Sequence, residues 1–373
     1  MRDEFETNRP QSARRVATGR GGTLEAPVRI VFVTQHVDPG HPALAATVPK
    51  VRALAERVDE VVILADRAVP DALPPNCRAR SYAAKTKIGR GLRFAQGLSA
   101  ELARSPRPAA VVAHMCPIYA VLAAPLARPL GVRVVLWYTH WNASPTLRWA
   151  ERLSTTVLSV DKRTFPLDSP KVRAIGHGID LSEFACSANG VPHSDLRVLA
   201  LGRYSRAKGL DVVLRAVKLA LDDGLDLRLE AHGPALTPDE RAHRGELEAL
   251  VRELELDKRV KLGHAVLRSE LPEVFGRADV LVNNMRAGAT DKVVYEACAS
   301  CVPAIASNPA FDTLLEPELR FEREDARGLA DRLLGLGRQP AEERRRLGEE
   351  LRKRVEAGHS VDSWADAVVE AAA

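Results

Sequence analysis

The chain has 373 residues, with 54 Lys or Arg against 49 Asp or Glu and a formal net charge of +5. A hydrophobic share of 46% with 28% charged residues excludes a wholly disordered chain and a collagen-like one. Domains average roughly 150 residues, so the length predicts two domains, each able to bury a core. The small positive excess does not by itself indicate a nucleic-acid partner.

Residues 1–27 mix Arg, Asp, Glu, Gly and Pro without an apolar core, which predicts a flexible arm rather than a targeting peptide. The only stretch that approaches the ~20 apolar residues of a membrane span lies at 109–127. One histidine and two prolines interrupt it, which favours a buried strand over 109–113 and a buried helix over about 119–130. We therefore expect a soluble, cytoplasmic protein.

The first half alternates apolar runs with amphipathic stretches. A β-branched run over 28–34 is typical of a strand buried on both faces of a parallel sheet, and a loop and a helix ending near Arg57 follow it. Further strands are predicted over 60–65, 109–114, 133–139, 155–160 and 172–176. This alternation of strands and helices predicts a doubly wound sheet in residues 28–185.

Residues 186–195 are rich in Ser, Asn, Gly, Pro and His, which predicts a linker before a second series of strands and helices in 196–357. The strands are expected over 196–202, 227–233, 260–264, 279–284 and 302–307, and the clearest helices over 211–222, 239–255, 292–300 and about 341–357. The predicted architecture is α/β, with two Rossmann-like domains facing across a cleft. Such sheets bind ligands at the carboxyl ends of their strands.

The chain has five cysteines, an odd number that does not suit a framework of paired disulfides. This is typical of free thiols in a reducing compartment. They are Cys77, Cys116, Cys186, Cys298 and Cys301. The last two form one C-x-x-C pair, but no second Cys or His pair at zinc spacing accompanies it. We expect buried packing there, and we expect no catalytic metal and no cofactor.

Two basic residues follow the first strand of the second half. That strand ends in Gly202, Arg203 comes next, and Lys208 lies five positions later, before Gly209. Glycine permits close backbone approach, while Arg offers a planar fork and Lys a point charge to phosphate oxygens. An ordinary solvated loop with surface cations explains the same residues.

A glycine-bearing loop at 286–291 precedes the helix that carries Glu296. Helix N-termini attract anions, so residues 288–291 are candidates for holding a phosphate or a sugar. The Glu296 carboxylate can accept hydrogen bonds from ribose hydroxyls. Taken alone, Glu296 is better explained as a structural acid on a helix.

Together these elements resemble the retaining GT-B glycosyltransferases of the large GT4 family, the glycosyl transferases group 1. The resemblance covers nearly all of 28–370. It rests on VDPGHPALAATVPKVRALAE, VLWYTHW, GHGIDLSEF, GRYSRAKGLDVVLRA and DKVVYEACASCVPAIASN, in this order. The closing HSVDSWADAVVE resembles the family's final helix, which would make 358–373 a helix crossing back to the first domain.

The resemblance implies transfer of a sugar from a nucleotide-diphosphate donor to an acceptor hydroxyl, and it implies a role for several residues. Arg203 and Lys208 would contact the diphosphate, and Glu296, matching the second Glu of the family's E-x7-E motif, would hold the ribose. Gly40 would face the donor phosphate and the acceptor. His140 would lie near the transferred sugar, although a locally paired strand-end histidine explains it as well.

One position departs from the family. Gly288 stands where the first Glu of E-x7-E usually approaches the donor sugar. Either Asp291 and Lys292 substitute for it, or the donor sugar differs, or the activity is weak. Asp291 is also explained as a simple helix cap.

Other functions remain open at this point. A non-catalytic nucleotide-sugar-binding protein of the same fold is the main alternative, and a GT-B nucleotide-sugar epimerase is a further one. The acceptor is a small molecule, a lipid-linked molecule or a glycan, and no nucleic-acid module is recognisable. A basic run with interleaved apolar residues would suit peripheral contact with an anionic membrane or an acidic acceptor, or is a solvated helix. Its members are Arg80, Lys85, Lys87, Arg90 and Arg93.

Overall fold

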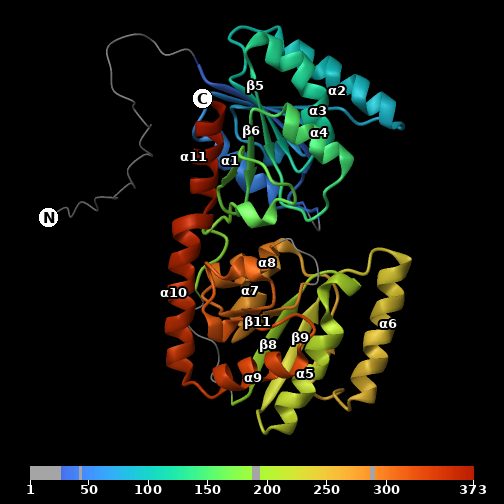
Figure 1. Cartoon of the computed structure of the whole chain (residues 1–373), viewed down its shortest axis with the longest axis vertical. Coiled ribbons are helices and arrows are strands. Elements are labelled where there is room, and N and C mark those ends of the chain that lie inside the picture. The colour runs from blue at the N-terminus through green and yellow to red at the C-terminus, as the bar shows by residue number, and fades with distance from the viewer. Residues whose placement is uncertain (1–26, 42–43, 187–193, 286–289) are drawn as a thin grey trace, which may run out of the picture.

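The computed structural model describes residues 27–41, 44–186, 194–285 and 290–373. They form two parallel sheets, one in each half of the chain, with helices on both faces (Figure 1). This confirms the expected α/β class with two Rossmann-like domains. The expected N-terminal arm and most of the linker lie outside the described residues.

The first sheet has the strand order β3-β2-β1-β4-β5-β6-β7. Its strands are β1 Arg29–Val37, β2 Glu60–Ala68, β3 Cys77–Ser81, β4 Ala110–His114, β5 Arg133–Trp137, β6 Thr156–Ser159 and β7 Val172–Ala174. Its helices are α1 Thr47–Ala55, α2 Lys87–Leu102, α3 Pro117–Ala127 and α4 Pro145–Leu153. The sequence did not predict β3, because this charged edge strand lacks the apolar run by which buried strands are recognised.

The second sheet has the order β10-β9-β8-β11-β12. Its strands are β8 Leu196–Leu201, β9 Leu227–His232, β10 Val260–Leu262, β11 Val280–Asn283 and β12 Ala304–Ala306. The helices are α5 Leu210–Asp222, α6 Pro238–Glu253, α7 Leu271–Gly276, α8 Lys292–Ala299, α9 Ala326–Gly337, α10 Ala341–His359 and α11 Val361–Ala372. In the part of the chain that is described, no helix is long and apolar enough to cross a membrane.

Two segments pass between the domains side by side. The Ile179 amide donates to the His359 carbonyl (2.7 Å), and the Val361 amide donates to the Ile179 carbonyl (2.8 Å). Gly176 lies beside this crossing with φ +74°, and a Cβ there would lie 2.0 Å from the Gly358 carbonyl oxygen. A side chain at Gly176 would therefore force the two segments apart.

After the crossing, α11 packs on α1 of the first domain (Figure 1). Trp364 of α11 is fully buried. The Arg57 guanidinium contacts the carboxylates of Asp366 (2.5 Å) and Asp362 (2.9 Å). The end of the chain is thus part of the first domain's core.

A disulfide joins Cys186 to Cys301, which lie 115 residues apart in the sequence. The expectation of free thiols is wrong for this pair, because cysteine spacing carries no information about so distant a partner. A reducing compartment would keep the two as thiols. Cys298 is a fully buried free cysteine, as the packing hypothesis expected.

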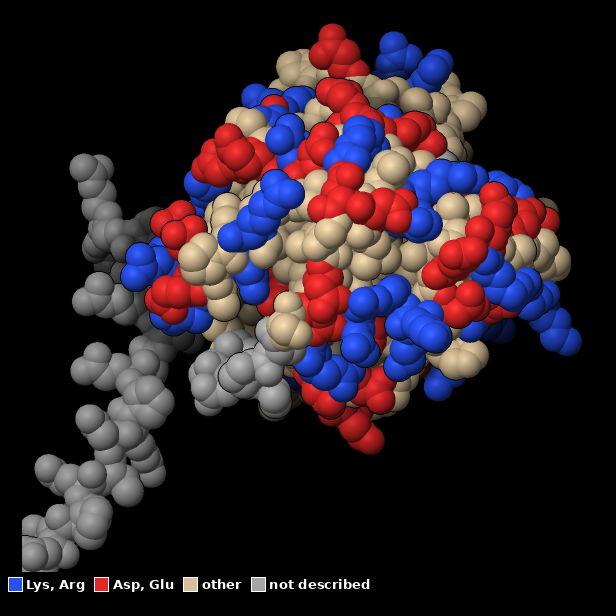
Figure 2. All heavy atoms as spheres, turned by 90° about the horizontal axis from the view of Figure 1, so that it is seen from below, with Lys and Arg blue, Asp and Glu red and all other residues tan. Residues whose placement is uncertain are grey.

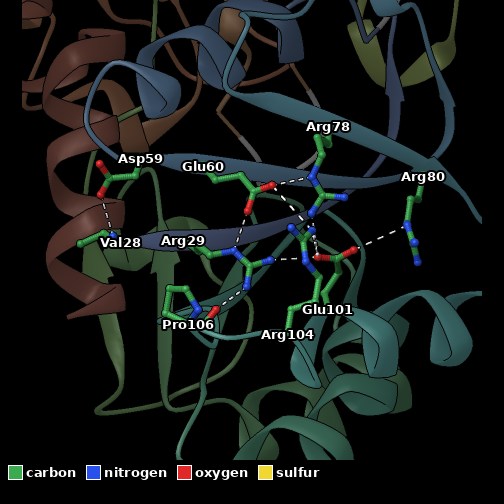
Figure 3. A network of polar contacts seen from close by, with 9 residues as sticks. All are labelled: Val28, Arg29, Asp59, Glu60, Arg78, Arg80, Glu101, Arg104 and Pro106. Carbon is green, nitrogen blue, oxygen red and sulfur yellow. Dashed lines mark hydrogen bonds and ion pairs between the residues drawn. The ribbon is translucent and has the colours of Figure 1, made fainter. Parts of the chain in front are cut away.

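An ion network closes the amino-terminal edge of the first sheet (Figure 3). Glu101 of α2 is completely buried and accepts hydrogen bonds from Arg29 (2.9 Å) and Arg78 (2.8 Å). Glu60 of β2 contacts the same two arginines. The network ties β1, β2 and β3 to α2 at the edge opposite the carboxyl ends of the strands.

The charged side chains on the outer end of the second domain alternate in sign. Figure 2 shows Lys and Arg next to Asp and Glu across this face rather than one continuous basic area. Arg327, for example, contacts both Asp331 (2.5 Å) and Asp223 (2.7 Å). This face therefore does not concentrate the chain's positive excess.

We predict that Glu101→Gln lowers the free energy of unfolding at pH 7 by about 3–5 kcal/mol, because it leaves arginines without their buried counter-charge. Burial alone would raise the pKa of Glu101, but the hydrogen bond and charge of Arg78 bring that pKa below its usual value. The stabilisation is thus present above the unfolded pKa of about 4.3 and is lost as the pH falls through the folded pKa.

Urea unfolding at pH 7 and pH 3 measures this effect. The difference between wild type and Glu101→Gln should shrink at pH 3, while the exposed control Glu253→Gln should match wild type at both. An equal difference at the two pH values would contradict the ionic origin of the stabilisation.

Candidate active site

Each sheet reverses its direction of winding at one point. In the second sheet β9 and β10 lie on one side of β8, while β11 and β12 lie on the other. The first sheet does the same between β1 and β4. At such a point the loops after the two central strands diverge and leave a crevice at the carboxyl edge, which is where open α/β sheets bind ligands.

The crevice after β8 is built around Gly202. This residue has φ +149°, and a Cβ there would lie 2.6 Å from Cε of Lys208. The Lys208 side chain therefore folds back across a position that only glycine leaves open. Tyr204 fixes the loop from the other side, because its hydroxyl donates to the Gly263 carbonyl at 2.7 Å.

Lys208 forms an ion pair with Asp291, which is at the start of α8. Asn283 at the end of β11 donates to the same carboxylate at 2.9 Å. Burial alone would raise the pKa of Asp291, but the charge and hydrogen bond of Lys208 lower it. Asp291 occupies the N-cap position without a capping side-chain hydrogen bond, so the simple cap explanation does not describe it.

Arg203 directly follows Gly202 in the chain. Its guanidinium is half-exposed and contacts Glu240 of α6 at 3.1 Å. Arg203 and Lys208 both line the crevice. The crevice also receives Gly202, His232, Asn283 and Asn284. The crevice thus combines two cations, the N-terminus of α5 and the side-chain amides of Asn283 and Asn284. These groups suit an anion such as a diphosphate.

Glu296 lies in a separate buried ion cluster. Its Oε1 atom is 2.7 Å from Nζ of Lys292 and 2.9 Å from Arg268. Arg268 also contacts Glu183 at 2.5 Å, where the chain crosses from the first domain. The structure thus joins Lys292 to Glu296, and Asp291 to Lys208, as two neighbouring groups at the start of α8.

Residues 183–354 match a family model described as glycosyl transferases group 1. This part of the chain belongs to that family. No curated protein sequence matches the chain significantly. We refer to residues 183–354 below as the group 1 domain.

Three solved structures are similar over nearly the whole chain. Sucrose-phosphate synthase from Thermosynechococcus elongatus is 20% identical with a TM-score of 0.69, covering 92% of this chain and 98% of that one. Anabaena HepE in complex with UDP-glucose is 15% identical with a TM-score of 0.72 and the same coverages. A glycosyltransferase from Rickettsia africae is 14% identical with a TM-score of 0.71, covering 93% and 98%. The fold is that of the GT-B glycosyltransferases.

Two further candidate residues, Gly40 and His140, lie in the first domain. Gly40 is exposed in a turn, where its amide donates to Asp38 at 2.9 Å. His140 is exposed after β5, and its Nδ1 accepts from the Asn142 amide at 3.2 Å, which fits the locally paired alternative. Gly288 lies outside the described residues. Among the described residues, no group of three or more His, Cys, Asp or Glu could hold a metal ion.

Sequence reasoning missed Lys50 of α1, which is 3% exposed and close to the group 1 domain. Its Nζ lies 3.3 Å from the Gly178 carbonyl oxygen and 5.2 Å from the ring centroid of Trp137. Burial, helped by the charges of Lys292 and Arg268, lowers the pKa of Lys50 to about 7. Helical spacing was the available signal, because Lys50 follows Thr47 by three residues and precedes Leu54 by four, on the buried face.

Two histidines lie close to this lysine. His114 at the end of β4 stacks on Trp137 with ring centroids 4.7 Å apart, and His177 lies in the crossing segment. Burial and the charge of Lys50 hold the pKa of both histidines well below 6.5. The two histidines therefore stay uncharged at neutral pH, beside a lysine that is about half charged.

We predict that Lys50→Met removes part of the pH dependence of stability. Between the folded pKa of about 7 and the unfolded pKa of about 10.4, the unfolded chain binds more protons, so wild-type stability should rise with pH. The single site contributes a slope of up to ~1.4 kcal/mol per pH unit.

Urea unfolding between pH 7 and pH 10 measures the slope. Lys50→Met should have a smaller slope than wild type and at least equal stability at pH 7, because methionine fills the site without a charge. The exposed control Lys353→Met should keep the wild-type slope. An unchanged slope in Lys50→Met would show that Lys50 is solvated and protonated in the folded protein over this range, as it is in the unfolded chain.

Proposed function

We propose that the protein is a retaining glycosyltransferase of the GT4 type, which moves a sugar from a nucleoside-diphosphate donor to an acceptor hydroxyl. The observation that carries the proposal is that Arg203 and Lys208 line one crevice with Gly202, at the winding reversal of the group 1 domain. The Anabaena neighbour binds UDP-glucose, which favours a UDP-sugar as the donor.

The two cations stabilise the charge that develops on the departing diphosphate. Without donor, each is held by a carboxylate, Lys208 by Asp291 and Arg203 by Glu240. A diphosphate carries more charge than either carboxylate and competes for both cations. When the donor binds, its diphosphate therefore replaces Asp291 as the partner of Lys208 and Glu240 as the partner of Arg203.

The reaction breaks the bond between the anomeric carbon and the diphosphate oxygen and forms a bond to the acceptor oxygen on the same face. The acceptor proton passes to the departing phosphate, so the mechanism requires no carboxylate base. Closure of the two domains excludes water and limits hydrolysis of the donor. The ion pair between Arg163 of the first domain and Asp312 of the second, at 2.7 Å, joins them beside the crossing segments.

The start of α8 supplies the sugar and ribose contacts in this proposal. Lys292 and Arg268 both approach Oε1 of Glu296, so the ribose hydroxyls would bind through Oε2. Asp291 takes over part of the contact that the family assigns to the position of Gly288. Its carboxylate is suited to this because it contacts Lys208 and Asn283, two residues that line the crevice.

The proposal includes a cytoplasmic location, where Cys186 and Cys301 would be kept as thiols. It also includes peripheral contact with an anionic membrane through the start of α2. Ile88 and Leu92 are 78% and 67% exposed there, which is unusual for apolar side chains. Three of the five basic residues contact the protein itself, namely Arg80, Arg90 and Arg93. The membrane contact would therefore depend mainly on Lys85 and Lys87.

We predict that Arg203→Ala and Lys208→Ala each weaken nucleoside-diphosphate binding by about 1.5–3 kcal/mol, or roughly 10- to 150-fold in Kd. Each change removes a charge-assisted contact to the anion. Calorimetry with UDP, GDP and ADP makes the measurement. Arg206→Ala is the matched control, because Arg206 lies in the same loop but contacts Glu246 of α6.

Unchanged affinity in both variants would place the diphosphate elsewhere. The activity itself is tested by incubating the protein with labelled UDP-, GDP- and ADP-sugars, with and without acceptors. We expect one donor class to give a glycosylated acceptor with retained anomeric configuration. Binding without transfer to any acceptor would instead favour the non-catalytic alternative, which the glycine at position 288 motivates.

A further inference from the structure

The disulfide between Cys186 and Cys301 ties residues 183–186, which follow the first crossing segment, to the turn after α8. The Cα atoms of the two cysteines are 5.0 Å apart, which is within the range that a disulfide spans. The helix that ends at this turn carries Glu296. One covalent bond thus connects the entry of the group 1 domain with the helix of its candidate ribose contact.

The two sulfur atoms differ in exposure from those of the other cysteines. Cys186 is the one exposed cysteine of the five, and Cys301 is half-buried. An exposed sulfur can be reached by small thiols and disulfides in solution. Burial raises the pKa of the free Cys298 to about 12, so Cys298 stays protonated at neutral pH and does not compete for Cys301.

The turn that presents Cys301 is one that glycine would form more easily. Cys301 has φ +60°, in the left-handed region, and its amide donates to the Cys298 carbonyl at 3.1 Å. A residue with a side chain is strained there. Gly348 of α10 packs so closely on this turn that a Cβ would lie 1.9 Å from the Cys301 carbonyl oxygen. The turn is therefore held in place, and its unfavourable cysteine supplies a sulfur at a fixed point.

The residues just before the disulfide contact the ion cluster that contains Glu296. Glu183 lies 2.5 Å from Arg268, and Arg268 lies 2.9 Å from Oε1 of Glu296. The Arg268 guanidinium is also 5.5 Å from the ring centroid of Phe184, which is completely buried. Movement of this segment would therefore change how Arg268 holds the Glu296 carboxylate.

Arg352 of α10 contacts the same two segments without a covalent bond. Its guanidinium donates to the carbonyls of Phe184 and Ala299, and Ala299 is the last residue of α8. These hydrogen bonds do not depend on the disulfide. They keep the two thiols close after the bond opens, so that it can form again.

We propose that Cys186 and Cys301 form a reversible modification site, a thiol pair that a small-molecule disulfide oxidises, and that the closed bond raises the affinity of the group 1 domain for its nucleotide. The closed bond holds Glu183 on Arg268, and Arg268 occupies Oε1 of Glu296 and leaves Oε2 for the ribose. The effect on the nucleotide rests on the proposed function. The reversible bond rests on the cysteine pair alone.

The oxidation consists of two thiol–disulfide exchanges. The exposed Cys186 thiolate attacks one sulfur of the small disulfide, forms a mixed disulfide and releases one small thiolate. The Cys301 thiolate then attacks Sγ of Cys186, closes the protein disulfide and releases the second. The two cysteine protons pass to the released thiolates, and the two electrons lost by the cysteines reduce the small disulfide. In a reducing cytoplasm the reverse exchanges keep the pair open.

The thiol pair is tested by equilibrating the whole protein with reduced and oxidised glutathione in changing ratio and counting free thiols after unfolding. Wild type should pass in one step from five free thiols to three as the mixture becomes more oxidising. Cys186→Ser should lose this two-thiol step. The control Cys77→Ser should keep it, because Cys77 has no part in the disulfide.

The effect on the nucleotide is tested by calorimetry on the oxidised and the reduced protein, with UDP, GDP and ADP as probes. We expect the nucleotide that binds to have a Kd at least about fivefold lower in the oxidised protein. The difference should be absent in Cys186→Ser. It should also be much smaller in Glu183→Ala, which can still form the disulfide but lacks the carboxylate that contacts Arg268.

The 2′,3′-dideoxy form of the same nucleoside diphosphate separates positioning of Glu296 from a general effect of the bond on the domain. This ligand lacks the ribose hydroxyls that would donate to Glu296. Its affinity should therefore be nearly equal in the two redox states. A disulfide that only stabilised the domain would act equally on both forms of the nucleotide.

A pair that stays closed, or stays open, at every glutathione ratio would overturn the modification site. Equal affinity of oxidised and reduced wild type for the nucleotide, or an equal change for its dideoxy form, would overturn the coupling through Glu296. A failure of UDP, GDP and ADP to bind in either redox state, with the two-thiol step intact, would count against the proposed function and not against the thiol pair.

Discussion

A parallel sheet that reverses its winding cannot fill the space above its two central strands, because the loops that leave them run in opposite directions. Both sheets of this chain have that constraint, at β8 and β11 in one domain and at β1 and β4 in the other. The crevice around Gly202 and a cavity of about 510 Å³ between α2 and α3 occupy these two places. The rest of the structure holds the two carboxyl edges toward each other, through the paired crossing segments and the packing of α11 on α1.

Charge is distributed differently over the amino edge of the first sheet and the carboxyl edge of the second. At the amino edge the arginines around Glu101 are neutralised within the protein, and their role is structural. At the carboxyl edge of the second sheet, Arg203 contacts Glu240 but its own side chain is half-exposed. A bound anion can replace Glu240 as the partner of Arg203 at modest cost, because Arg203 is half-exposed. Breaking the ion pairs around Glu101 would instead leave a buried charge unpaired.

Much of this arrangement could be predicted from the sequence, and the limits have physical causes. Buried strands such as β1 and β11 are continuous apolar runs, and the loop from Gly202 to Gly209 was recognisable from its residue types. The strand β3 was not, because its charged residues CRARS form an edge that faces solvent. The disulfide between Cys186 and Cys301, the pairing of Lys208 with Asp291 and the burial of Lys50 depend on contacts between distant segments, which local patterns do not encode.

The most direct test of the central claim, that a nucleoside diphosphate binds at the winding reversal of the group 1 domain, is amide hydrogen exchange with saturating UDP, GDP or ADP. The nucleotide that binds should slow exchange in peptides covering 202–210 and 290–297, since these carry the loop after β8 and the start of α8. Peptides from the amino edge around Glu101 should not change. Protection confined to the first domain, or no protection with any of the three, would contradict the account.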